Sequence, residues 1–282
     1  MAEHRIGFAL HQMKRGLEYR DIVVPPPGYT LVEFDAAGQE FRWMAIASND
    51  YTMLQLCLPG EDAHSFMGSK INPKLEYREI MGLVAQGDKE AKRTRQAGKV
   101  SNLSLQYRTS AKRLMITARV QHEMDMTLKE AERNHFVYQR SYTGVPRYWE
   151  QQIAQTKQTG YVETFAGRRV QVRGDWTGRF GWGMGSTAIN YRIQGTGADQ
   201  KYLALATLTP YLLAVGARFS FDLHDGLYFL APDAKVTEFC AKAKQMLDNL
   251  PYREAWGFTP PIPMTWDCKA GKSWGTMKGV KL

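Results

Sequence analysis

Two aspartates that follow strand-like segments constrain this chain more than any other feature of its sequence. The apolar run 29–34 follows a stiff proline-glycine turn and ends on Asp35, as a buried strand that reaches a site would. Near the other end of the chain, residues 217–223 and 227–230 predict a hairpin whose tight turn contains Asp225. Each acid is therefore expected at the end of a strand, although sequence spacing alone does not bring the two together.

The chain between these strands is predicted to be largely helical. Apolar periodicity and capping residues indicate helices over 40–48, 51–58, 88–105, 128–159 and 187–214. Residues 160–172 predict a second hairpin that turns at Ala166-Gly167, and the glycine-rich stretch 174–185 is expected to be a loop. The sequence therefore predicts an α+β fold.

The charge balance favours a polyanionic partner. Lys and Arg number 37 against 28 Asp and Glu, which gives a formal charge of +9, and nucleic acid is favoured over a membrane surface. No apolar run is long enough for a membrane span, and the N-terminal residues carry charges in place of an apolar signal core. We expect a soluble, cytoplasmic protein whose three cysteines are reduced structural thiols.

Asp35 and Asp225 could hold divalent ions. Nucleotidyl transfer needs two such ions, and carboxylates are the hard ligands that they prefer. The alternative is that each acid caps a turn, which lone acids at strand ends do more often.

A basic helix supplies a second candidate component. Arg95, Lys99 and Leu103 are spaced by four residues, so they lie along one face of the helix. This face would suit a triphosphate with a sugar beyond it, or it could be an ordinary solvated cationic surface. Tyr107, just beyond, could stack on a base or belong to the core.

These segments resemble family A (DNA polymerase I-like) DNA polymerases, of the bacteriophage type. The resemblance covers roughly residues 20 to 275 and depends on several motifs in the expected order. Residues 34–42 resemble motif A, 95–107 motif B and 223–225 motif C, while 60–64, 160–169 and 190–199 are similar to smaller family signatures.

The resemblance implies roles for individual residues. Asp35 and Asp225, with the Ala36 carbonyl, would hold two Mg²⁺ ions. His64, Arg95, Lys99 and Leu103 would contact the incoming dNTP, Glu40 would exclude a 2′-hydroxyl, and Tyr107 would occupy the templating position. The residues expected at the DNA are Asn190, Gln194, His224 and Arg168.

The resemblance also implies a fold and a domain order. We expect an antiparallel palm sheet that carries the metal site and a largely helical fingers subdomain. Residues 1–58 would form the first part of the palm, 59–145 the fingers and 146–282 the second part of the palm. The chain departs from the family at Gly226, Leu103 and Arg108, where an acid, an aromatic and a glycine are usual.

The sequence therefore predicts a template-directed DNA polymerase that acts on primer-template DNA. Little chain precedes Asp35, so the right-hand fold is expected without thumb and exonuclease domains. A separately encoded polypeptide could supply them, as in a split or truncated phage enzyme that acts in the cytoplasm of a bacterial host. The alternative function is a non-catalytic DNA-binding remnant, inactive without a thumb.

Overall fold

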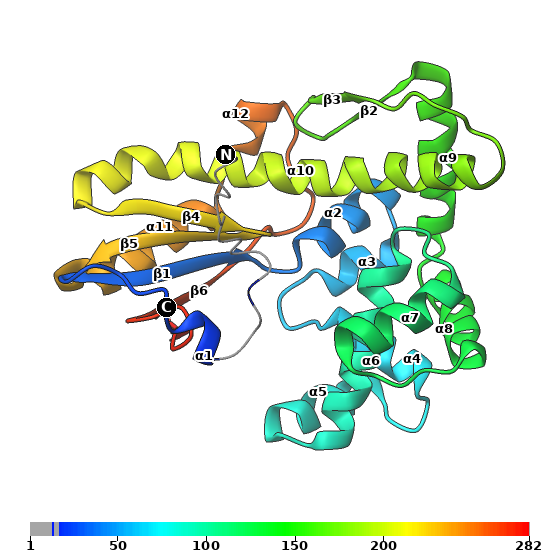
Figure 1. Cartoon of the computed structure of the whole chain (residues 1–282), viewed down its shortest axis with the longest axis horizontal. Helices are drawn as coiled ribbons and strands as arrows, with labels where there is room; N and C mark the ends of the chain where they lie inside the picture. The colour runs from blue at the N-terminus through cyan, green and yellow to red at the C-terminus, as the bar shows by residue number, and fades with distance from the viewer. Residues whose placement is uncertain (1–12, 14–16, 282) are drawn as a thin grey trace, which may run out of the picture. The chain divides into compact units, whose positions relative to one another are not determined.

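The computed structural model describes residue 13 and residues 17–281, which form two compact units (Figure 1). The sheet unit takes its described residues from Met1–Ala37, Ala198–Ala255 and Met264–Leu282, and the helical unit consists of Gly38–Gly197 and Trp256–Pro263. The sequence instead predicted palm segments at 1–58 and 146–282 and a fingers segment at 59–145. These bounds differ from those of the two units, and the functional division stays a prediction.

The sheet unit is built on an antiparallel sheet of five strands in the order β4-β5-β1-β6-β7. The strands are β1 (Tyr29–Ala36), β4 (Arg218–Leu223), β5 (Gly226–Pro232), β6 (Trp266–Gly271) and β7 (Lys278–Gly279). The helical elements of this unit are α1 (Leu17–Arg20), η2 (Asp233–Lys235), α11 (Val236–Asp248), most of α12 (Tyr252–Trp256) and the second part of α10 (Gly178–Val215). The predicted strand before Asp35 and the predicted hairpin around Asp225 are confirmed.

One face of this sheet is covered by helices. Phe34 of β1 and Phe229 of β5 contact Phe239 of α11 edge to face, and Tyr211 of α10 stacks on the same phenylalanine ring. Because side chains alternate along a strand, Asp35 points to the opposite face. The sheet therefore buries one side against helices and presents the first acid on the other.

The helical unit contains most of the described helices. It comprises α2 (Gln39–Ser48), α3 (Tyr51–Leu56), α4 (Ala63–Ile71), α5 (Tyr77–Gln86), α6 (Lys89–Leu105), α7 (Ala111–His122), α8 (Leu128–Ser141), α9 (Gly144–Thr159), the hairpin of β2 (Tyr161–Glu163) and β3 (Arg169–Gln171), and the first part of α10. Aromatic side chains fill its core: Tyr142 contacts the rings of Phe41, Phe66 and Tyr138.

The predicted glycine-rich loop is wrong over part of its length. Helix α10 begins at Gly178, nine residues before the helix start that the sequence predicted. Trp176 and Met184 pack against Val162, Val172 and Ala188. Each glycine inside a helix costs about 1 kcal/mol relative to alanine, and this burial offsets that cost. Local helix propensity does not include such tertiary burial, so it predicts a loop here.

Two smaller expectations concern cysteines and membrane spans. Cys57, Cys240 and Cys268 are free and buried, as predicted. None of the described helices is long and apolar enough to cross a membrane. The cytoplasmic location stays a prediction.

Candidate functional site

The sheet brings Asp35 and Asp225 together. Strand β1 pairs with β5 so that Asp35 lies opposite Gly226, the residue that follows Asp225 in the hairpin turn. The amide of Ala36 donates to the carbonyl of Asp225 over 3.4 Å, and the two carboxyl groups share a hydrogen bond. Two acids far apart in the sequence thus meet at one end of adjacent strands.

The protonation of Asp35 reflects this crowding. Burial first, and then the negative charges of Asp225 and Glu33, raise the pKa of Asp35 to about 7. The ammonium of Lys269 opposes this shift. Neighbouring carboxylates repel each other when both are charged, so a cation bound between Asp35 and Asp225 would be favourable.

This carboxylate pair has the chemistry of a magnesium site. Mg²⁺ prefers hard oxygen ligands and keeps several waters, so it needs only one or two protein carboxylates together with substrate oxygens. No group of three or more potential ligands from His, Cys, Asp and Glu occurs in the described chain. A further ligand near the pair could be the backbone carbonyl of Ala36, a water, the substrate, or the carboxylate of Asp267, which lies opposite Asp35 where β1 pairs with β6.

A polar network beside Asp35 was not anticipated from the sequence. The hydroxyl of Tyr228 and the ammonium of Lys269, 2.8 Å away, both donate to the carboxylate of Glu33. Glu33 is only 8% exposed, so its charge needs these partners. An acid within an otherwise apolar strand was the signal that could have pointed to this network.

In the helical unit, helices α4 and α6 cross backbone against backbone. A Cβ on Gly98 would lie 2.1 Å from the carbonyl oxygen of His64, and one on Gly68 would lie 2.8 Å from the carbonyl oxygen of Thr94. Only glycine permits this approach at either position. The crossing holds His64 of α4 against the helix that carries Arg95 and Lys99.

The predicted basic face is only partly available to a ligand. The guanidinium of Arg95 makes two bonds to the carboxylate of Asp62, with nitrogen-oxygen distances of 2.7 and 3.2 Å. Burial acts to raise the pKa of Asp62, but hydrogen bonds from Arg95 and Ser65 hold it below its usual value. Among the described residues, Lys99 has no ion-pair partner. Asp62 is thus a partner of the basic face that motif spacing did not reveal.

His64 is neutral in this setting. Burial first, and then the positive charge of Arg95, lower the pKa of His64 to about 4. The side-chain amide of Asn102 lies 2.9 Å from the carbonyl of Ala63 and 3.3 Å from Nδ1 of the imidazole. With Nδ1 accepting this bond, the proton remains on Nε2, so His64 can donate a hydrogen bond to an anionic ligand.

A second cluster surrounds Glu40 of α2. Its two carboxylate oxygens accept from the amides of Gln106, at 3.0 Å, and Gln194, at 2.9 Å. Burial first, and then the charge of Glu40, raise the pKa of the neighbouring Tyr107 phenol. The structure therefore brings together three residues that the sequence nominated separately, namely Glu40, Tyr107 and Gln194, and it adds Gln106.

The remaining predicted residues have mixed surroundings. Leu103 and Asn190 are partly exposed on α6 and α10. Arg168 donates to the hydroxyl of Tyr191 at 2.6 Å and to the carbonyl of Gly195 at 2.9 Å, which fixes its guanidinium within the fold. In the sheet unit, His224 is exposed in the hairpin turn with a φ of 53°. The functional roles of all these residues stay predictions.

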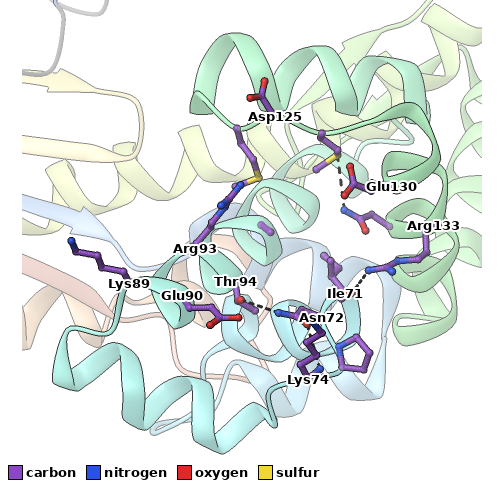
Figure 2. Close-up of a pocket in the computed structure, with 15 residues that line it drawn as sticks. Ile71, Asn72, Lys74, Lys89, Glu90, Arg93, Thr94, Asp125, Glu130 and Arg133 are labelled. Atoms are coloured by element: carbon purple, nitrogen blue, oxygen red, sulfur yellow. Dashed lines mark hydrogen bonds between the residues drawn. The ribbon is translucent and has the colours of Figure 1, made fainter.

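A cavity of the helical unit lies on another part of α6. It has a volume of about 720 Å³ and is lined by Lys89, Glu90, Arg93 and Thr94 of this helix, together with α8 residues such as Arg133, as Figure 2 shows. None of the predicted site residues lines this cavity. It is therefore separate from the predicted nucleotide-binding face.

The structure shows the consequences of two of the three positions at which the sequence departs from the family pattern, Gly226 and Arg108. A Cβ on Gly226 would lie 3.5 Å from an Asp35 carboxylate oxygen and 3.3 Å from the Tyr228 ring, so a larger side chain would crowd the acid pair. Arg108 has a φ of 60°, in a left-handed conformation that costs a non-glycine residue about 1–2 kcal/mol. The usual glycine at this position would avoid that cost.

Comparison with known proteins identifies the fold and then the family. The polymerase domain of Pol1 from M. smegmatis, solved with a DNA primer-template and a dNTP, has a TM-score of 0.77 and 24% sequence identity to this chain. The match covers 94% of this chain and 44% of that one. The fold is therefore that of a polymerase domain. The model of DNA polymerase family A matches residues 9–276, and the chain belongs to this family.

Two bacterial relatives have similar identities. DNA polymerase I of Deinococcus radiodurans is 28% identical over 92% of this chain, and the thermostable DNA polymerase I of Thermus thermophilus is 28% identical over 94%. The matched regions are 25% and 29% of those proteins. The chain thus spans less than a third of the length of these relatives. The predicted family and α+β fold are confirmed.

Proposed function

We propose that this chain is a template-directed DNA polymerase that transfers a nucleotidyl group from a dNTP to a primer 3′-hydroxyl. Family membership supports polymerase chemistry in general, and the relatives are named DNA polymerase I. The observation that carries the proposal is the convergence of Asp35 and Asp225 from distant parts of the sequence, with the pKa of Asp35 raised to about 7.

The acid pair is proposed to hold two Mg²⁺ ions with help from the Ala36 carbonyl. When bound, such ions supply activation of the attacking hydroxyl and stabilisation of the leaving phosphates. The protein's part is to fix the two carboxylates, and the pairing of β1 with β5 supports this role because it sets their separation.

Residues of the helical unit are proposed to bind the nucleotide. Lys99 and the neutral His64 would contact the phosphates, Arg95 would contribute charge while paired with Asp62, and Leu103 would pack against the nucleotide. Glu40, fixed by two glutamine amides, is proposed to exclude a 2′-hydroxyl. Tyr107 is proposed as the residue at the templating position.

DNA contacts are proposed for four further residues. Asn190, Gln194, His224 and Arg168 would contact the primer terminus and template, where minor-groove acceptors look alike for every base pair. The bacteriophage origin, the cytoplasmic location and a separately encoded thumb or exonuclease partner stay predictions.

A second candidate function is a DNA-binding protein without catalytic activity. It is favoured by Gly226, which stands where the family resemblance implies an accessory acid.

Primer extension distinguishes the two candidates. The chain is incubated with Mg²⁺, a primer annealed to a longer template, and either dNTPs or rNTPs. We expect extension that follows the template sequence, requires Mg²⁺ and prefers dNTPs. Binding of the primer-template without any nucleotide addition would instead support the non-catalytic candidate.

A further inference from the structure

A separate cavity of about 700 Å³ lies in the helical unit among the end of α6, helices α8 and α9, and the start of α10. None of the predicted site residues lines it. Three tryptophans line it, and two of them, Trp176 and Trp182, have a cation over the ring. Aromatic faces interleaved with positive charge are the usual means of holding unpaired nucleic acid.

Arg108 and Trp182 form the pair in which the tryptophan is exposed. The guanidinium carbon of Arg108 lies 4.1 Å from the centroid of the Trp182 ring. A Cβ on Gly185, one turn further along α10, would lie 3.0 Å from an Arg108 guanidinium nitrogen, so the missing side chain leaves room for that group. Arg108 thus combines a strained, left-handed backbone with a guanidinium held over the Trp182 ring. Strained residues often occur at binding sites.

The two tryptophans differ in how much they contribute to the fold. Trp176 packs on the cluster of Val162, Val172 and Ala188, and the ammonium of Lys157 lies 5.5 Å from its ring centroid. Trp182 is 46% exposed. The ring of Trp182 is thus the one that a base can reach without disturbing the core.

We propose that Trp182 and Arg108 form a stacking site for an unpaired DNA strand, with Lys157 beside it. A base would stack on the exposed part of the indole, and the two cations would attract the phosphates of the same strand. Glu150 also lines the cavity, and the positive charges of Arg108 and Lys157 outweigh its negative charge.

The identity of this strand as the template rests on the proposed function. Arg108 directly follows Tyr107 in the sequence, and Tyr107 is the residue proposed at the templating position. A template strand held at Tyr107 would therefore reach the pair of Arg108 and Trp182, because Arg108 is the next residue of the protein chain. This assigns a role to Arg108, the departure that replaces the usual glycine.

The test is an equilibrium titration of the full chain with a labelled oligothymidylate of about 12 nucleotides, a length within the range of single-strand sites. Fluorescence anisotropy is followed in EDTA without nucleotides, so the result does not depend on catalysis. Trp182→Ala is expected to weaken binding at least about fivefold, because one base loses its stacking partner. Arg108→Gly removes the guanidinium and relieves the backbone, so it is expected to weaken binding without loss of stability.

A matched control comes from α8. Phe136 is 60% exposed, has the guanidinium of Arg140 5.4 Å from its ring centroid, and does not line the cavity. Phe136→Ala is expected to bind the oligothymidylate as the unmodified chain does. Circular dichroism is used to check that each variant is folded.

Two further probes show what the site prefers. A blunt duplex of the same length is expected to bind Trp182→Ala and the unmodified chain equally, since its bases are already stacked. An oligouridylate tests whether RNA binds as well as DNA. Unchanged oligothymidylate affinity in Trp182→Ala, an equal loss for the duplex, or an RNA affinity above that for DNA would each overturn the proposal. A chain that extends no primer but shows the expected losses would contradict the proposed function alone.

Discussion

Gly98→Ala tests whether the crossing of α4 and α6 is as close as the structure has it. The added Cβ would lie 2.1 Å from the carbonyl oxygen of His64 and 2.5 Å from the amide nitrogen of Gly68. Normal contacts are about 3.5 Å, so the two helices must separate by more than about 1 Å. Both obstacles are backbone atoms, which no rotamer change can move.

The magnitude follows from two opposing contributions. Overpacking of a tight interface costs about 3 kcal/mol or more at the upper end of its range, and alanine gains about 1 kcal/mol over glycine inside a helix. We expect a net loss of about 2 kcal/mol or more in the free energy of unfolding. Because the crossing holds His64 against the helix of Arg95 and Lys99, nucleotide binding should weaken as well.

Gly82→Ala on α5 is the matched control. No atom lies within 4 Å of the position of its added Cβ, so only the gain in helix propensity remains, about 0.5–1 kcal/mol. Urea titration of both variants gives the free energies of unfolding. Equal stability of the two variants would refute the close crossing.

Three other predictions concern single residues. Glu40→Ala should raise the incorporation of ribonucleotides relative to deoxynucleotides at least about tenfold in single-nucleotide extension, because it removes the group proposed to exclude the 2′-hydroxyl. Unchanged discrimination between the two nucleotide types would exclude Glu40 from this role. Asp50→Ala should lower the free energy of unfolding by about 2 kcal/mol, since the buried Asp50 carboxylate accepts from the amides of Met53 at 2.9 Å and Gly144 at 2.7 Å; urea titration measures this loss. His64, with a pKa lowered to about 4 from about 6.5 when unfolded, should contribute stability fully above pH 6.5 and lose it as the pH falls toward 4, by up to about 3 kcal/mol. Urea titrations against pH should show this slope in the unmodified chain and lose it in His64→Gln, and an NMR titration of His64 near 6.5 would contradict it.

Local sequence signals predicted the elements that carry the two acids. The apolar run before Asp35 and the tight turn at Asp225 each contain enough information for a strand and a hairpin. Local signals do not predict that β1 pairs with β5, because this pairing joins segments separated by most of the chain. That the two aspartates meet is therefore a finding of the structure and could not be derived from spacing.

Other features depend on packing that no local pattern contains. The start of α10 at Gly178 depends on burial of Trp176 and Met184 against the β2-β3 hairpin and α10 itself. The periodicity of α6 predicted the helix, yet the pairing of Arg95 with Asp62 required the fold of α4. Partners that come from another element are the part of the site that sequence reasoning missed.

The central claim is that Asp35 and Asp225 are the catalytic acids. Its most direct test is the rate of single-nucleotide addition to a bound primer-template by Asp35→Asn and Asp225→Asn, with the DNA affinity of each variant measured in parallel. Asp233→Asn is the control, because Asp233 directly follows β5 at the end away from Asp225 and pairs with Lys272. We predict rates at least about a thousandfold lower for the two site variants, with DNA affinity retained and the control unaffected, because the change removes a proposed metal ligand and leaves the proposed DNA backbone contacts in place. An unchanged rate in Asp35→Asn or Asp225→Asn would contradict the account.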